Sequence, residues 1–161
     1  MDDFNYDLFE NIDDLEIYNM NISKLLCGHN FSSVKFLVIW GCNKITRLEK
    51  KIFDGFPMLQ SLKVVSNSEL KTIDKEAFSN LKNLRELELF FNDLSELHTE
   101  LFSSLVNLEE LFLGYNKLKY FDLKIMDYIV NVKVINLVEN PIGNKEEILN
   151  RFKHSEIKIV I

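Results

Sequence analysis

The sequence predicts an α/β repeat solenoid, in which short parallel strands stack side by side into one sheet. Two features of the 161-residue chain predict this fold: a pattern of about 24 residues recurs along it, and each copy contains two apolar residues two positions apart. Residues two apart on a strand point to the same side of a sheet. One copy cannot bury such a pair, whereas stacked copies form a continuous core.

The repeats align from residue 12 to residue 142. The copies Leu84–Asn107 and Leu108–Asn131 share apolar residues at the first, fourth, sixth, eleventh and fourteenth places and an asparagine at the ninth. Leu59–Asn83 and Val34–Met58 fit with one extra residue each, a shorter copy covers residues 12–33, and a divergent copy begins at Val132. We therefore predict a single domain with six repeats over residues 12–142.

Both ends of a solenoid expose its core, so each end requires a cap. Apolar residues alternate near the start of the chain, and we expect residues 1–11 to cover the first strand. Residues 143–161 predict a helix followed by a strand. Asn144 and Glu147 have the spacing of a capping box, and Ile148, Leu149 and Phe152 form an apolar stripe that would pack on the last repeat. Ile157 and Ile159 would then be the inward residues of a seventh strand.

This pattern resembles the leucine-rich repeat family, L-x-x-L-x-L-x-x-N-x-L, over nearly the whole chain. Phe53, Phe78 and Phe102 form a column similar to the F-x-x-L half of the typical class, which is common in extracellular and innate-immune receptors, and Met126 takes that place in the next repeat. The resemblance implies a horseshoe with a concave parallel sheet and a mostly irregular or short-helical convex side. It also implies that the asparagines at the ninth place are buried and satisfy backbone groups; these are Asn67, Asn92, Asn116 and Asn140, with Cys42 as their substitute.

Charge and composition argue against several classes of function. The net charge of −6 disfavours nucleic-acid or anionic-membrane surfaces, and no apolar run is long enough to span a membrane. The three histidines fall at unrelated places in the repeat, so we expect no metal site, no cofactor and no catalytic centre. Cys27 and Cys42 lie at different phases of adjacent repeats and are expected to remain unpaired. The repeat class favours an extracellular location, whereas a native start at Met1 favours the cytoplasm.

The residues beside the inward pairs should line the concave face, and many of them are aromatic. Residues between the inward pairs are Glu16, Val38, Lys63, Glu88, Phe112, Asn136 and Lys158; those after the second inward residue are Tyr18, Trp40, Val65, Phe90, Gly114, Val138 and Val160; those before the first are Asp14, Phe36, Ser61, Glu86, Glu110, Val134 and Glu156. A solvated sheet face would be mostly polar. An alternative is that residues 1–11 fold over Phe36, Val38 and Trp40.

We interpret this face as the surface of a non-catalytic module that binds a protein partner, with a receptor ectodomain or immune recognition as the setting that the family implies. The expected contact residues are Tyr18, Phe36, Val38, Trp40, Val65, Glu86, Glu88, Phe90, Glu110, Phe112 and Tyr115, with Phe91 at the margin. Large apolar patches with polar rims mark interaction sites. Two alternatives remain: a symmetric homodimer through the same face, and the substrate-recognition part of a longer enzyme.

Overall fold

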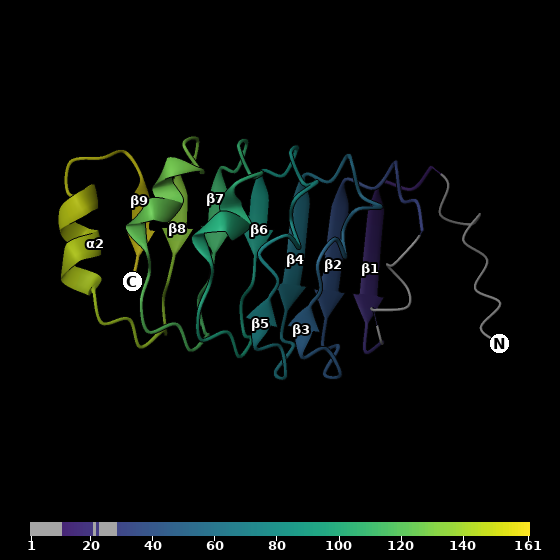
Figure 1. The fold of residues 1–161 in the computed structure, drawn as a ribbon, viewed down its shortest axis with the longest axis horizontal. Helices are drawn as coiled ribbons and strands as arrows, with labels where there is room; N and C mark the ends of the chain where they lie inside the picture. The colour runs from purple at the N-terminus through teal and green to yellow at the C-terminus, as the bar shows by residue number, and fades with distance from the viewer. Residues whose placement is uncertain (1–10, 21, 23–28) are drawn as a thin grey trace.

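The computed structural model describes residues 11–20, 22 and 29–161. Seven parallel strands form one sheet in the order β1-β2-β4-β6-β7-β8-β9 (Figure 1). The strands are β1 (Asp14–Tyr18), β2 (Phe36–Trp40), β4 (Ser61–Val65), β6 (Glu86–Glu88), β7 (Glu110–Phe112), β8 (Val134–Asn136) and β9 (Lys158–Val160). The predicted repeat solenoid is therefore confirmed. The expected cap at residues 1–11 lies, apart from Asn11, outside the described residues, and so does Cys27.

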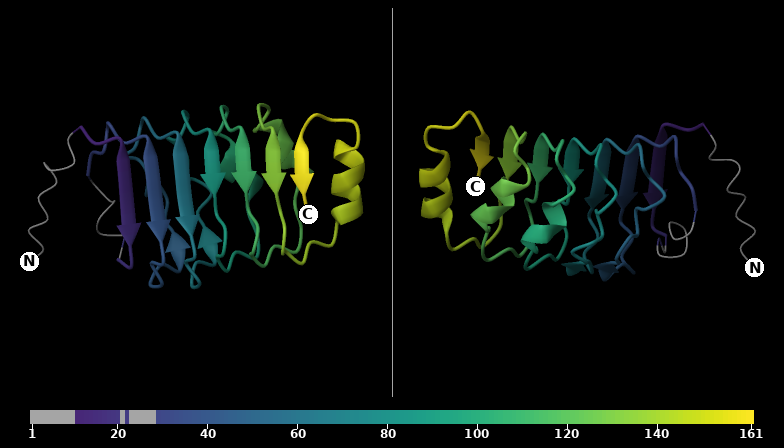
Figure 2. Two further views of the ribbon diagram at one scale, coloured as in Figure 1. Left: turned by 180° about the vertical axis from the view of Figure 1, so that it is seen from behind. Right: turned by 45° about the horizontal axis from the view of Figure 1, so that its top comes forward.

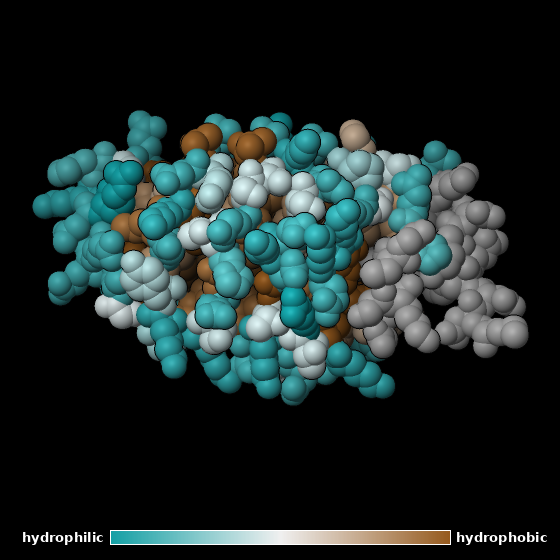
Figure 3. Space-filling view, in the orientation of Figure 1, coloured by the Kyte–Doolittle hydropathy of each residue, from teal (hydrophilic) through white to brown (hydrophobic). Residues whose placement is uncertain are grey.

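The opposite, convex side of the solenoid contains short elements joined by turns. A two-stranded parallel sheet pairs β3 (Arg47–Leu48) with β5 (Thr72–Ile73), and the later repeats have the short 3₁₀ helices η2 (Thr99–Phe102) and η3 (Leu123–Asp127). Figure 2 shows the seven strands from one side and these elements behind them. Hydrophilic residues cover most of the described convex surface, with hydrophobic residues visible between them (Figure 3).

The core lies between the sheet and the convex side, and it is built from the predicted apolar places. The inward leucines of the fourth and fifth repeats are fully buried: Leu87 in β6 and Leu111 in β7, and Leu89 and Leu113 just after these strands. The phenylalanine column is buried too, and neighbouring rings of Phe53 and Phe78 lie 5.9 Å apart. Met126 is only partly buried at the same place. Stacking the repeats thus closes the core that a single repeat could not form.

The asparagines at the ninth place form a buried ladder, as the resemblance implied. Asn92 accepts a hydrogen bond from the backbone N–H of Asn67 (3.0 Å) and donates to the carbonyls of Val64 (2.8 Å) and Leu89 (2.9 Å). Asn67, Asn116 and Asn140 also reach the preceding repeat: they donate to the carbonyls of Ile39, Leu89 and Leu113 and accept from the N–H groups of Cys42, Leu94 and Leu118. Cys42 is buried and free in the same position, and its backbone N–H donates to Asn67. Each polar side chain thereby satisfies backbone groups where the chain leaves the sheet.

The register of the last strand differs from the prediction by two residues. Ile159, not Ile157, lies opposite Ile135, so Val160 pairs with Asn136 and Lys158 pairs with Val134. A slip of two leaves every side chain on its predicted face, because side chains alternate with a period of two. The apolar pattern alone therefore could not distinguish the two registers. The backbone N–H of Lys158 donates to the carbonyl of Lys133 and fixes the observed one.

Two details of the C-terminal cap also correct the prediction. The helix α2 (Lys145–Phe152) packs Ile148 and Phe152 on the core, but Leu149 is 50% exposed. Asn144 does not cap the helix through its side chain. Its Oδ1 accepts from the backbone N–H of Phe121 (3.2 Å), and its Nδ2 donates to the Phe121 carbonyl (3.0 Å) and to the Glu147 carboxylate of α2 (3.0 Å).

Candidate partner-binding face

The register places the predicted face residues in three rows across the outer side of the sheet. The first row is Asp14, Phe36, Ser61, Glu86, Glu110, Val134 and Lys158, and the second row is Glu16, Val38, Lys63, Glu88, Phe112, Asn136 and Val160. The third row begins with Tyr18, Trp40 and Val65, and continues with Phe90, Gly114 and Val138 just beyond the strands. Between these rows, Leu37 and Ile39 of β2 are fully buried. The doubly apolar strand β2 therefore has one core face and one outer face.

At the N-terminal end of the face, Tyr18 and Trp40 stand beside each other on β1 and β2. Their ring centroids are 5.7 Å apart in an edge-to-face arrangement, and the residues are 43% and 50% exposed. The Tyr18 hydroxyl donates a hydrogen bond to the Glu16 carboxylate, and this bond raises the pKa of Tyr18 above its usual value. Phe36 is similarly exposed in the first row. In the part of the chain that the structure describes, this end of the face therefore has three aromatic side chains exposed to solvent.

Toward the C-terminal end, four rings form an aromatic cluster: Phe90, Phe91, Phe112 and Tyr115. Phe90 lies at its centre, with ring centroids 5.8 Å from Phe112, 6.1 Å from Phe91 and 6.3 Å from Tyr115. Phe91 and Tyr115 stack at 4.3 Å. Phe90 and Phe112 are half-buried, whereas Phe91 and Tyr115 remain exposed. The exposed part of the cluster therefore includes Phe91, which the sequence placed only at the margin.

Local backbone geometry explains how the cluster forms. A Cβ at Gly114 would lie 2.6 Å from the Phe90 ring. Because Gly114 has no side chain, the Phe90 ring can lie beside it in the third row. Phe91 and Tyr115 have φ values of 56° and 55°. The residue before the ladder position has positive φ in every repeat; the other members are Asn19, Gly41, Ser66 and Glu139. This conformation is costly for aromatic residues, and here it turns two rings toward each other.

An ion-pair network separates the two aromatic regions. Lys63 Nζ lies 2.8 Å from Glu86 Oε1 and 3.2 Å from Glu88 Oε2, and the Ser61 hydroxyl donates to Glu86 at 2.6 Å. Partial burial opposes the charge on Glu86, yet the bonds from Lys63 and Ser61 outweigh it and lower the pKa of Glu86. Burial likewise opposes the charge on Lys63, but the two glutamates raise the pKa of Lys63.

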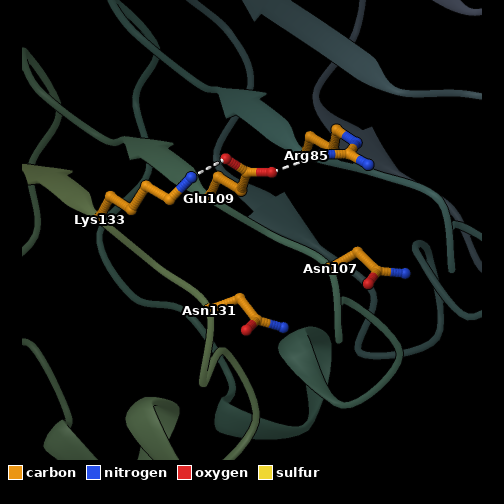
Figure 4. Close-up of a pocket in the computed structure, with 5 residues that line it drawn as sticks. All are labelled: Arg85, Asn107, Glu109, Asn131 and Lys133. Carbon is orange, nitrogen blue, oxygen red and sulfur yellow. Dashed lines mark hydrogen bonds and ion pairs between the residues drawn. The ribbon is translucent and has the colours of Figure 1, made fainter.

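A second asparagine ladder, which the sequence analysis missed, lies at the edge where the strands begin. Asn83, Asn107 and Asn131 each donate at 2.8 Å to a carbonyl of the preceding repeat. Their signal was visible, because each ends a consecutive repeat. With Arg85, Glu109 and Lys133, Asn107 and Asn131 line a pocket of about 250 Å³ (Figure 4). Hydrogen bonds from Lys133 and then Arg85 lower the pKa of Glu109.

No group of three or more histidine, cysteine, aspartate or glutamate side chains is arranged to hold a metal ion within the described part of the chain. No helix there is long and apolar enough to cross a membrane.

The repeats and their geometry define the class of protein. The family model "Leucine rich repeat" matches residues 32–94 and 86–142. The chain belongs to the leucine-rich repeat family, as the sequence predicted. A search of curated proteins found no match.

The solved structures that share this fold include two with TM-scores of 0.65 and 0.68. The "Crystal structure of TLR13-ssRNA13 complex" is 20% identical with a TM-score of 0.65; the alignment covers 88% of this chain and 20% of that chain. The "Crystal structure of mouse RP105/MD-1 complex" is 19% identical with a TM-score of 0.68, and covers 90% and 25%. This chain spans a quarter or less of the length of those two proteins. The expectation that nucleic acid is excluded finds no support here, because one neighbour is a complex with single-stranded RNA.

Proposed function

We propose that this chain is a non-catalytic module that recognises a protein partner through the concave face of its sheet. The observation that carries the proposal is the exposure of Tyr18, Phe36 and Trp40 on that face, each at 43–50%. Exposed aromatic surface of this kind is favoured at protein interfaces, where tryptophan and tyrosine supply much of the binding energy. A hydrophobic surface with a charged rim is typical of interaction sites.

The dimensions of the face suit such an interface. Seven strands at a spacing of about 4.8 Å give a sheet about 30 Å wide, enough for about 800 Å² buried on each partner. Phe91 and the eleven residues expected from the sequence are the proposed contact residues. The eleven are Tyr18, Phe36, Val38, Trp40, Val65, Glu86, Glu88, Phe90, Glu110, Phe112 and Tyr115. Within this set we assign direct contact to the exposed rings and support to the half-buried Phe90 and Phe112.

The biological setting that we propose is recognition within a receptor ectodomain or an innate-immune protein. The support is the fold shared with TLR13 and RP105, one of them in complex with the protein MD-1. Fold alone does not define a function, so this setting depends on the partner that is found.

A display library of natural protein fragments tests the proposed face. Fragments selected on the wild-type chain would be measured against Trp40→Ser and against the matched variant Tyr120→Ser, which alters a ring that is 56% exposed outside the three rows. We expect Trp40→Ser to weaken binding by about 2 kcal/mol or more and Tyr120→Ser to leave it unchanged. Equal effects of both variants would contradict a concave site.

Sedimentation of the wild-type chain over a range of concentrations tests the alternative of a homodimer. A mass that rises with concentration, and falls back to the monomer in Trp40→Ser, would assign the same face to self-association instead.

A further inference from the structure

A groove of about 330 Å³ crosses the first row on the concave side of the sheet. Phe36 forms one end and Glu110 the other, and the remaining lining residues are Gln60, Ser61, Arg85, Glu86 and Glu109. Ser61 is buried between Phe36 and Glu86 on neighbouring strands. Its small side chain leaves space that a larger residue would fill.

The charges along this groove are compensated except at one end. Glu86 is paired with Lys63 at 2.8 Å, and Glu109 is paired with Arg85 at 2.6 Å and with Lys133. Glu110 makes no ion pair or hydrogen bond through its side chain with any described residue, although it is half-buried. It also lies directly opposite Glu86 in the parallel register, where like charges repel.

The three rows of the face as a whole also carry a net negative charge. The three rows contain the five carboxylates Asp14, Glu16, Glu86, Glu88 and Glu110, against the two lysines Lys63 and Lys158. Such a face attracts cationic partners and repels the phosphates of RNA. Polar and charged groups across an interface are arranged so that their potentials are complementary.

We propose that the partner is a protein segment with a lysine or arginine side chain that enters this groove and pairs with Glu110. This inference rests on the proposed function. The aliphatic part of the cationic side chain lies over the groove while its head reaches the carboxylate. Phe36 is three strands away, about 14 Å, so a different, apolar residue of the same segment contacts it. Arginine suits the site best, because its planar head binds a carboxylate through two hydrogen bonds.

The test uses short random peptides displayed on phage. Peptides selected on the wild-type chain are sorted by whether Trp40→Ser removes their binding. Among those that depend on Trp40, we expect lysine and arginine to be enriched over the starting library. A chosen peptide is then synthesised with arginine and with citrulline, a neutral analogue of nearly the same shape.

The two peptides are measured against the wild-type chain, Glu110→Gln, and Glu146→Gln, which removes an equal charge from the exposed side of α2. We expect Glu110→Gln to weaken the arginine peptide about tenfold and the citrulline peptide less than about twofold. Glu146→Gln should change neither by more than about twofold. Unchanged unfolding midpoints would establish that both variants fold.

The outcomes separate the two proposals. If no selected peptide depends on Trp40, both the concave site and the cationic anchor are overturned. If peptides depend on Trp40 but lack a basic preference, or lose affinity equally in both forms with Glu110→Gln, only the anchor is overturned. Binding of a mixed-sequence single-stranded RNA that Trp40→Ser abolishes would also overturn it, as would a Trp40-dependent dimer of the chain itself.

Discussion

The two aromatic regions of the concave face use the same places in the repeat but have different neighbours. Trp40 and Phe90 both occupy the third row, each just after a strand's second inward residue. Trp40 lies between Tyr18 and Val65 in the register, its ring meets that of Tyr18 edge to face, and it remains half exposed. Phe90 lies beside Gly114, and its ring fills the space that a side chain would occupy there.

This difference shows that the position of a glycine decides what an aromatic residue does. In the second repeat the glycine is Gly41, which occupies the left-handed turn after Trp40 at φ 66°. The third-row position of this repeat therefore carries a side chain, that of Trp40. In the fifth repeat the glycine is in the row, and the left-handed turn is occupied by Tyr115. We therefore expect Trp40 to contribute mainly to binding and Phe90 mainly to the stability of the fold.

The largest expected difference concerns the ladder beneath the two regions. Asn92→Ala should lower the free energy of unfolding by about 2–3 kcal/mol, because one N–H and two carbonyls lose a buried partner. Cys42→Ala should cost less than about 1 kcal/mol, because the Cys42 side chain makes only long sulfur contacts, at 3.7 and 3.9 Å. Chemical denaturation measures both losses of unfolding free energy. Equal losses would mean that the side-chain hydrogen bonds of Asn92 contribute no more to stability than the Cys42 side chain does.

Filling the row at Gly114 should remove the distinction between the regions. A Cβ there would meet Phe90 at 2.6 Å and Val138 at 2.9 Å, so Gly114→Ala should destabilise the chain by about 1–3 kcal/mol. Gly143→Ala is the matched control, because its nearest neighbour would be at 3.6 Å, an ordinary contact. Thermal unfolding of both variants decides the point, and a neutral Gly114→Ala would show that Phe90 moves without cost.

The rings themselves give a smaller effect. Phe90→Ala should cost about 1–2 kcal/mol of unfolding free energy, since a half-buried ring with three aromatic neighbours is lost. Trp40→Ala should cost less than about 1 kcal/mol, since the ring is half exposed and contacts one aromatic neighbour. Urea unfolding of the pair measures this contrast. A larger loss for Trp40 would place it in the folded core of the N-terminal end.

The smallest effect concerns pH and the network between the regions. The pKa of Glu86 is below its ordinary value of 4.5, so its stabilising contribution is complete above about pH 4.5 and is lost as pH falls through the lower, folded value. The stability difference between wild type and Glu86→Gln should therefore be no more than about 1 kcal/mol near pH 7 and should shrink toward pH 3. Unfolding midpoints across this range measure it, with Glu146→Gln as the control. A difference independent of pH would exclude the ion pair as its cause.

The sequence predicted the fold because the repeat constrains every copy to the same solution. An apolar pair, a buried asparagine and a phenylalanine recur together in successive repeats. A wrong alignment of the repeat would therefore have broken this pattern in every copy. The first and second rows from β1 to β8 and the buried Cys42 follow from that regularity. The exposure of Trp40 was predicted for the same reason, because its place in the repeat faces away from the core.

Features that occur once, or that depend on the backbone, were not predictable in this way. The register of β9 depends on the length of the loop after α2. The alternation of apolar residues cannot distinguish two registers that differ by two residues. The stacking of Phe91 on Tyr115 requires left-handed backbone that aromatic residues seldom adopt. The side chain of Asn144 bonds both backbone groups of Phe121, which is distant in sequence, as well as the Glu147 side chain of its own helix.

The buried ladder also gives the solenoid a direction along which it comes apart. The amide of each ladder asparagine reaches back: Asn140 holds the Leu118 N–H and the Leu113 carbonyl, and Asn116 holds the Leu94 N–H and the Leu89 carbonyl. Each repeat is therefore clamped by the one that follows it. A force applied to the C-terminus would detach the last repeat first. Its loss would remove the asparagine that holds the preceding repeat, so the repeats would open one after another toward the N-terminus.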